Sequence, residues 1–329
     1  MTTKCFSLFC FLTICTLCFA KKQSPYTFYK TDSKEIYGIC LTQNRSMLAV
    51  ADNRDVKVFS TESADLLQVF SPGHHDRILS VDISKDGTLL ASAGKDSTIV
   101  LWDFLHSGII QTLRIHQGIV TSVKFSPDGQ YLLSGGSDHH VILYDLKQKR
   151  IIREFEDHHN DITSVSFSED GHRFASTGGD GLICVYDLPG KTLITSFAGS
   201  KNWIRDICFS SDGNHLLTCG DDAKIKDWDI TNPENVALNQ KKIHLKDWLI
   251  SVDVSESDSL QVVGAVNGGI EIQAAQYKYI GKIGTPVNKV LLLPCKEEHI
   301  RFVVSTIGKG VFKMDASSMN LIMPKNMEL

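Results

Sequence analysis

Histidine, serine and aspartate recur as a set in this chain, and together they could form the triad of a serine hydrolase. In such a triad the histidine takes the serine proton and the aspartate orients the histidine. The set occurs three times: His74, Ser92 and Asp96; His116, Ser134 and Asp138; and His158, Ser176 and Asp180. A hydrolase needs one triad, and none of these serines lies in the G-x-S-x-G turn that exposes a nucleophile. We therefore predict a structural role for the set, no catalytic residue and no enzyme activity.

Metal binding is the other chemistry to consider, because histidine pairs stand at 74–75, 139–140 and 158–159. Adjacent residues in an extended chain point to opposite faces, so one pair is poorly placed to give an ion two ligands. The ligand spacings typical of zinc sites are also missing. Asp221-Asp222 could attract a hard cation, but Asp222 continues the aspartate series described below. We predict neither a metal nor another cofactor.

A fixed step of 42 residues separates the copies of the set. The same step relates the Asp-Gly pairs that begin at 86, 128, 170 and 212, and it extends the serine and aspartate series to Thr218 and Asp222. Each step ends in an aromatic-Asp pair: Trp102-Asp103, Tyr144-Asp145, Tyr186-Asp187 and Trp228-Asp229. A period of about 40–45 residues with a Trp-Asp ending is typical of a propeller blade. The chain is therefore predicted to be a stacked array in which each repeat is buried against its neighbours.

One step contains four short apolar runs, for example at 78–83, 89–93, 98–102 and 109–113, and Asp-Gly between the first two is a strong hairpin signal. Four antiparallel strands form one blade. Inner strands are predicted to begin near Ile36, Ile78, Val120, Ile162, Ile204, Leu249 and Val287. The fold class is thus an all-β, seven-bladed propeller that occupies residues 21–329 as one domain, with the best repeats at 73–230. The polar connection at 231–246 is predicted to be a surface loop.

Ring closure also has a signal in the sequence. Residues 26–30 precede the first blade by the offset that an outer strand has in the other repeats, although no blade comes before them. They are predicted to form the outer strand of the seventh blade and so to close the ring. Residues 320–324 compete for the same place, and we favour the N-terminal strand.

These motifs resemble those of the WD40-repeat family, over about 24–320 in rhythm and 73–230 in motif. The resemblance implies a hydrogen-bonded His–Ser/Thr–Asp–Trp tetrad in each well-formed blade. The members here are His74, Ser92, Asp96 and Trp102; His116, Ser134, Asp138 and Tyr144; His158, Ser176, Asp180 and Tyr186; and Thr218, Asp222 and Trp228. Ser200 stands where the fourth histidine is expected, so that set departs from the family pattern. The resemblance also implies a non-catalytic scaffold, a monomeric propeller within a complex, that binds a protein or peptide partner.

In propellers of this kind the start of each inner strand and the turn before the third strand face one rim near the central channel. The corresponding positions, predicted to bind the partner, are Glu35, Tyr37, Arg77, Leu79, Lys95, Asp161, Trp203, Arg205, Asp221 and Trp248. Tryptophan and arginine are enriched at binding hot spots. The alternative for Trp203 and Trp248 is that they pack against the neighbouring blade. The alternative function is small-molecule binding or hydrolysis at the channel mouth.

Bulk composition is that of an ordinary globular chain, with 329 residues, 42% of them hydrophobic, and a net charge of −4. No block of like charges stands out, so no nucleic-acid partner is expected, although a local basic face is possible.

The first 20 residues differ from the rest. Lys4 precedes an uncharged run at 5–19, and Cys18-Phe19-Ala20 gives the small residues of a signal-peptide cleavage site. The run is shorter than the roughly 20 residues that span a membrane, so no stable span is expected after cleavage. The prediction is a secreted or periplasmic protein; the alternative is a cytoplasmic one. The later cysteines, Cys40, Cys184, Cys208, Cys219 and Cys295, are odd in number and lack C-x-x-C, so they do not indicate a disulfide framework.

Overall fold

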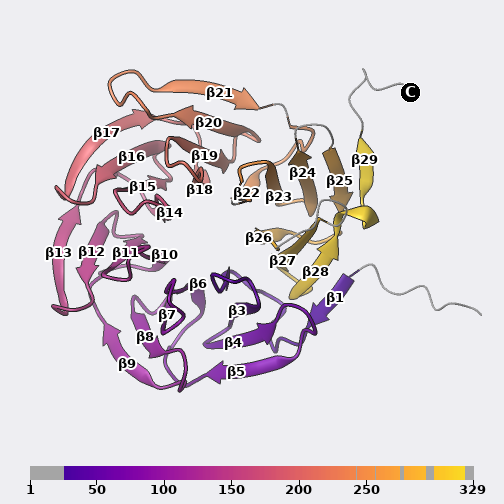
Figure 1. Ribbon diagram of the computed structural model, residues 1–329, viewed down its shortest axis with the longest axis horizontal. Helices are drawn as coiled ribbons and strands as arrows, with labels where there is room; N and C mark the ends of the chain where they lie inside the picture. The colour runs from indigo at the N-terminus through magenta and orange to yellow at the C-terminus, as the bar shows by residue number, and fades with distance from the viewer. Residues whose placement is uncertain (1–25, 242, 256, 275–277, 294–299, 323–329) are drawn as a thin grey trace, which may run out of the picture.

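Seven antiparallel sheets follow one another along the chain and close into a ring (Figure 1). The computed structural model describes residues 26–241, 243–255, 257–274, 278–293 and 300–322. The predicted signal peptide lies outside the described residues, as does Cys295. The all-β, seven-bladed propeller predicted from the 42-residue step is thus confirmed.

Blades two to five carry the regular step, and each runs from an inner strand at the channel to an outer strand at the circumference. Their strands are β6 (Ile78–Ile83), β7 (Leu89–Gly94), β8 (Ile99–Asp103) and β9 (Ile109–Leu113); β10 (Val120–Phe125), β11 (Tyr131–Gly136), β12 (Val141–Asp145) and β13 (Arg150–Phe155); β14 (Ile162–Phe167), β15 (Arg173–Gly178), β16 (Leu182–Asp187) and β17 (Thr192–Ala198); and β18 (Ile204–Phe209), β19 (His215–Gly220), β20 (Ile225–Asp229) and β21 (Ala237–Lys241). All four predicted inner-strand starts in this region are confirmed.

The other three blades depart from the step. Blade one contains β2 (Ile39–Leu41), β3 (Met47–Asp52), β4 (Asp55–Ser60) and β5 (Leu66–Phe70); blade six contains β22 (Leu249–Val254), β23 (Leu260–Ala265), β24 (Gly269–Ala274), β25 (Lys278–Lys282) and β29 (Asn320–Ile322); blade seven contains β26 (Val287–Leu292), β27 (Arg301–Thr306), β28 (Val311–Asp315) and β1 (Tyr26–Tyr29). The inner strand of blade one begins at Ile39 rather than at the predicted Ile36, because the Ile36 N–H is bonded to the Thr306 carbonyl of blade seven at 3.1 Å.

The Asp-Gly turns explain why the first two strands of a regular blade fold back on each other. In blade two, Gly87 has φ +69°, a left-handed value that favours glycine. Asp86 Oδ1 accepts hydrogen bonds from the Ser84 hydroxyl at 2.6 Å and from the Thr88 N–H at 3.0 Å. The serine hydroxyl and the threonine groups hold the pKa of Asp86 below its usual range, so the turn carries an ionised carboxylate at neutral pH.

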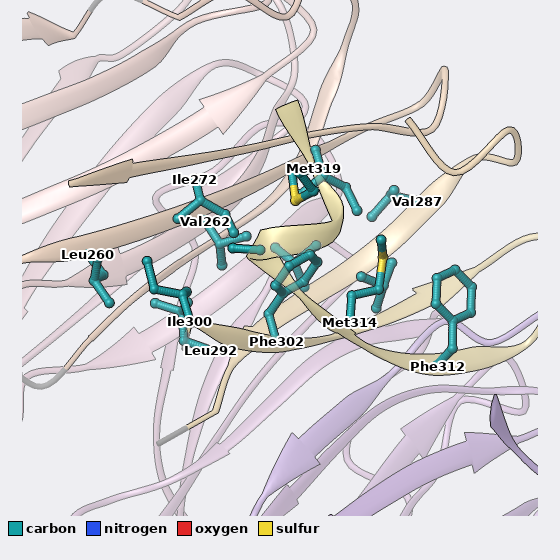
Figure 2. Close-up of a cluster of buried hydrophobic side chains, with 14 residues drawn as sticks. Leu260, Val262, Ile272, Val287, Leu292, Ile300, Phe302, Phe312, Met314 and Met319 are labelled. Atoms are coloured by element: carbon teal, nitrogen blue, oxygen red, sulfur yellow. The ribbon is translucent and has the colours of Figure 1, made fainter. Parts of the chain in front are cut away.

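Apolar side chains from adjacent blades pack together and form the cores between the sheets. Figure 2 shows the cluster between blades six and seven, where Val262 and Ile272 lie near Leu292 and Phe302. All four side chains are essentially inaccessible to water. Each blade is therefore stable only with a neighbour on both faces, as expected of a repeat array.

Closure of the ring follows the sequence prediction. β1 is antiparallel to β28, with Tyr26 opposite Met314 and Tyr29 opposite Val311, so the N-terminal strand completes blade seven (Figure 1). Tyr29 is buried, and its ring meets the edge of Phe59 in blade one at 5.5 Å. The first strand thus joins the two ends of the repeat array.

The competing C-terminal segment has a different place, and blade six consequently has five strands where four were predicted. β29 pairs with β25, so it adds an outer strand to blade six (Figure 1). A short 3-10 helix, Ala316–Ser318, leads back from β28, and Met319 then packs where Gly281 leaves room: a Cβ on Gly281 would lie 2.9 Å from the Met319 Cγ. The absence of a side chain at 281 therefore allows this return.

The predicted surface loop at 231–246 is wrong in part, because it contains β21, the outer strand of blade five. An outer strand lies largely in water and needs little apolar alternation. In β21 (ALNQK) Leu238 is the large apolar residue, and it is 45% exposed. The polarity that suggested a loop reflects the exposed position of this strand.

Candidate functional site

The histidine–serine–aspartate sets form buried hydrogen-bond networks inside the blades. In blade two, His74 Nδ1 lies 3.1 Å from both Asp96 carboxylate oxygens, and its Nε2 lies 2.8 Å from the Ser92 hydroxyl. The Trp102 indole donates to the same hydroxyl at 2.8 Å. Asp96 also accepts the His75 N–H at 2.8 Å, which fixes the loop that enters the blade. Blade two therefore has the complete tetrad.

Blades three and four repeat the first three members and lack the fourth contact. His116 lies 2.9 Å from Asp138 and 2.8 Å from Ser134, and His158 has the same distances to Asp180 and Ser176. Neither aromatic member makes the hydrogen bond of regular geometry to the serine that the sequence led us to expect. The Tyr144 hydroxyl accepts instead from the Gln111 amide at 3.2 Å, and the buried Tyr186 hydroxyl lies near Ser176 and Cys184 without a hydrogen bond of regular geometry to either.

The carboxylates of these networks stay ionised far into the acid range. Burial alone would raise the pKa of Asp138, but the hydrogen bonds and charge of His116 and the N–H of Gln117 outweigh it and lower the pKa to about 2. For Asp180, burial likewise raises the pKa, but the hydrogen bonds from His158 and from the N–H of His159 outweigh it and lower the pKa to about 2. Ser134 and Ser176 are buried between strands, so no substrate can reach their hydroxyls. These sets therefore act structurally.

Blade five lacks the histidine and replaces it with a lysine from its third strand. Lys226 Nζ lies 2.6 Å from Asp222 Oδ2 and donates to the Gly199 carbonyl at 2.5 Å. The Ser200 hydroxyl reaches the same carboxylate at 3.3 Å, and the Trp228 indole donates to the Thr218 hydroxyl at 2.9 Å. The small Ser200 leaves space for the long lysine side chain, so the carboxylate keeps a cationic partner.

The position of Lys226 recurs as an ionic position in blades one and six. Lys226 pairs across the sheet with Thr218; the corresponding residues in blades two, three and four are apolar or neutral: Val100, Ile142 and Cys184. In blade one it is Lys57, which lies 2.8 Å from the buried Asp52. In blade six it is the buried Glu271, which accepts the His244 N–H at 2.7 Å. Sequence analysis missed these residues, although a charge in an apolar third strand was a usable signal.

The predicted partner-binding residues lie together at one end of the ring. A recurrent backbone hydrogen bond ties the turn before the third strand to the residue before the inner strand: Lys95 N–H to the Arg77 carbonyl, Gly179 to Asp161, Asp221 to Trp203 and Val266 to Trp248, at 2.9–3.0 Å. Because neighbouring strands are antiparallel, these turns and strand starts share one end. We call this surface the rim.

Two ion pairs neutralise part of the rim, and a histidine lies beside a third carboxylate. Arg77 is paired with Glu35 of the preceding blade. Asp161 lies 3.7 Å from the His139 ring. Arg205 forms two parallel hydrogen bonds to Asp221, both 2.7 Å, and its guanidinium lies 4.7 Å from the centre of the Trp203 ring. The bidentate geometry is the strongest form of such a pair. Lys95, by contrast, is exposed and its ammonium has no partner among the described residues.

The two rim tryptophans differ in exposure, and the preceding blade explains the difference. Trp203 is half-buried against Gly179 of blade four, where a Cβ would lie 2.8 Å from the Trp203 Cε2. Trp248 occupies the same position in blade six. In the preceding blade, however, the residue that corresponds to Gly179 is Asp221, and its side chain is bound to Arg205. Trp248 is 51% exposed. Trp203 therefore packs partly against the neighbouring blade, as the alternative interpretation expected, whereas half of the Trp248 side chain is exposed and accessible to a partner.

The channel mouth lies inside the rim, above a cavity of about 370 Å³. Its lining includes one residue from each blade at the level of the mouth: Tyr37, Leu79, Thr121, Thr163, Arg205, Ile250 and Asn288. Below them, Asp206 accepts from Lys289 Nζ at 2.6 Å and from the Ser164 and Ser251 hydroxyls at 3.0 Å. Asp253 accepts the Leu292 N–H at 2.8 Å, and burial raises its pKa. The carboxylates of the channel thus connect blades.

Within the described ranges, no group of three or more His, Cys, Asp or Glu side chains is arranged to hold a metal ion. The same part of the chain contains no helix with the length and apolar character that a membrane span requires.

Comparison with known proteins agrees with the geometry. The family model for the WD domain, G-beta repeat, matches four segments: residues 64–103, 107–145, 149–187 and 191–229. Each segment begins near the outer strand of one blade and ends with the third strand of the next, the same offset that places β1 in blade seven. No curated protein matches the chain. WD40 propellers are generally protein-interaction scaffolds and typically have no catalytic activity. With its four matched repeats inside a seven-bladed ring, the chain belongs to the WD40-repeat family.

Proposed function

We propose that this protein is a non-catalytic interaction platform that binds a protein or peptide partner on the rim, at the side formed by blades five and six. The observation that carries the proposal is the exposure of Trp248 beside the stacked pair of Trp203 and Arg205. Tryptophan and arginine are the residue types most enriched at interface hot spots. A large apolar ring that is half in water gains free energy when a partner covers it.

The alternative, hydrolysis or small-molecule binding at the channel mouth, would need free acid or base groups there. The acidic and histidine side chains of the rim are Glu35, Asp161, His139 and Asp221, and each is engaged within the protein: Glu35 with Arg77, Asp161 with His139, and Asp221 with Arg205. Releasing Glu35 or Asp221 would break an existing ion pair, and releasing Asp161 would break its contact with His139. The rim is therefore better suited to recognition than to proton transfer.

Replacement of Trp203 and Arg205 by alanine is expected to weaken partner binding at least about tenfold, since each is of a type that commonly contributes more than 1 kcal/mol. Binding is measured by fluorescence anisotropy with peptides selected from a random 12-residue display library on the immobilised full-length chain. The matched control is Leu105→Ala, which removes a 68% exposed apolar side chain from the turn between β8 and β9, at the end opposite the rim, and should leave binding unchanged. Equal affinity of the Trp203→Ala, Arg205→Ala variant and the native chain would refute this rim as the site.

A further inference from the structure

The rim between blades five and six carries an excess of positive charge around its exposed tryptophan. Lys201 lies in the loop before blade five, Lys224 in the turn between β19 and β20, and Lys246 in the loop before blade six. All three side chains are exposed, and none has an ion-pair partner among the described residues. We call these lysines, with Trp203, Arg205 and Trp248, the five–six sector.

Two of the three carboxylates in the same sector are held in ion pairs. Asp221 is held by both guanidinium hydrogen bonds of Arg205. Asp222 is held by Lys226 at 2.6 Å. Asp247 accepts the N–H of Trp248 at 2.8 Å. Asp247 has no cationic partner among the described residues and keeps its charge, but the three exposed ammonium groups outnumber it, so the sector has a net positive charge.

Resting on the proposed function, we infer that the partner presents a short acidic segment with at least one apolar side chain, and that this segment binds the five–six sector. The whole chain has a net charge of −4, so the local excess of lysine is opposite in sign to the net charge of the molecule. Complementary charge guides the encounter and sets the register of a bound segment. The apolar side chain would cover the exposed Trp248 ring, which supplies the part of the affinity that charge alone does not.

An acidic peptide fits this surface better than a nucleic acid does. Proteins that bind a phosphate backbone through its charge typically neutralise about 6–10 phosphates. The five–six sector offers three free lysines, and Asp247, which has no cationic partner among the described residues, directly follows one of them. A regular phosphate chain would pass this carboxylate, whereas a peptide can place its acidic side chains at the lysines and leave neutral ones elsewhere.

The test is a selection of random 12-residue peptides, displayed on phage, against the immobilised full-length chain. Selected peptides are expected to be enriched in Asp and Glu and to contain an aromatic or aliphatic residue. Replacing Lys201, Lys224 and Lys246 by alanine should weaken their binding at least tenfold in 50 mM salt. Raising the salt concentration to 300 mM should weaken binding to the native chain in the same direction, because exposed charges are screened.

The matched control removes three lysines from the opposite end of the ring, where Lys147, Lys149 and Lys191 follow third strands. This variant has the same change in net charge and should bind the peptides as the native chain does. Trp248→Ala should weaken them while leaving their salt dependence in place.

Three results would overturn the inference, and they separate it from the proposed function. Selected peptides that are neutral or basic, yet depend on Trp203 and Arg205, would remove the acidic partner and leave the rim as the binding site. Peptides that bind independently of every rim variant, or no selected peptide at all, would overturn the proposed function as well. A 12-nucleotide single-stranded DNA that binds more tightly than the peptides, and is lost in the triple-lysine variant, would assign the sector to nucleic acid.

Discussion

Loss of residues 21–30 is expected to lower the melting temperature by about 10 °C, because it removes β1 and reopens the ring. The strand supplies the outer edge of blade seven and buries Tyr29 against Phe59 of blade one. Burial of a large aromatic side chain contributes about 1.5–3 kcal/mol, and the ladder hydrogen bonds add to it. In a domain of this size each kcal/mol shifts the melting temperature by about 2 °C or slightly more. Differential scanning calorimetry measures the change.

Two single variants show whether the effect comes from the strand itself. Tyr29→Ala should reproduce about half of the loss, since it removes the buried ring and leaves the ladder. Tyr29→Phe is the matched control and should be neutral or slightly stabilising: the hydroxyl is buried without a partner among the described residues, and burial raises its pKa to about 12. An unchanged melting temperature for the deletion would contradict closure by the N-terminal strand.

Asp206→Ala is expected to reduce the free energy of unfolding by about 3–5 kcal/mol, the largest effect of any single substitution considered. Asp206 is 4% exposed and lies where four blades meet the channel. It accepts from Ser164 of blade four, Ser251 of blade six and Lys289 of blade seven. Its removal leaves the partly buried ammonium group of Lys289 and two hydroxyls without their acceptor. Urea denaturation at neutral pH measures the loss.

The control for this prediction also removes the positive charge of Lys289, which loses its partner in the single variant. Asp206→Ala combined with Lys289→Met should recover a large part of the stability, because an apolar pair has no unpaired ion to solvate. A cost below about 1 kcal/mol for Asp206→Ala, or no recovery in the double variant, would show that water in the channel replaces the lost partners.

The sequence predicted the blades because the signals that define them are local. An Asp-Gly turn fixes the hairpin at Gly87, and the apolar runs on either side fix the strand faces. Even the closing strand was predicted, since its offset from the first blade equals the offset inside every repeat. These features depend on spacing along the chain, which the sequence displays directly.

The elements that were missed depend on what lies across the fold. β21 is polar because its surroundings are water, and β29 returns to blade six because Gly281 leaves a space for Met319. Lys226 takes the place of a histidine because residue 200, 26 positions earlier, is a small serine. Each depends on a pairing between residues whose proximity only the folded ring establishes.

At the rim, too, the sequence located the residues but did not show which of them pair with each other. The sequence located its residues, and the recurrent backbone hydrogen bonds place them at one end of the ring. It did not show that Arg205 is committed to Asp221, nor that Trp248 is exposed while Trp203 is half-covered. That difference comes from Gly179 and Asp221, which are one repeat apart and lie in the blade before each tryptophan. The three free lysines became visible only once the paired charges were known.

The central claim is that a partner binds the rim between blades five and six. Hydrogen–deuterium exchange of the full-length chain, with and without a selected peptide, tests it most directly, because protection of backbone amides maps the covered surface. We predict protection at 201–205, 221–224 and 246–250, with the outer strands unchanged. Protection that falls instead on β5 and β9, where Leu66, Leu67 and Ile110 form an exposed apolar band, would contradict the claim and place the binding surface on the circumference.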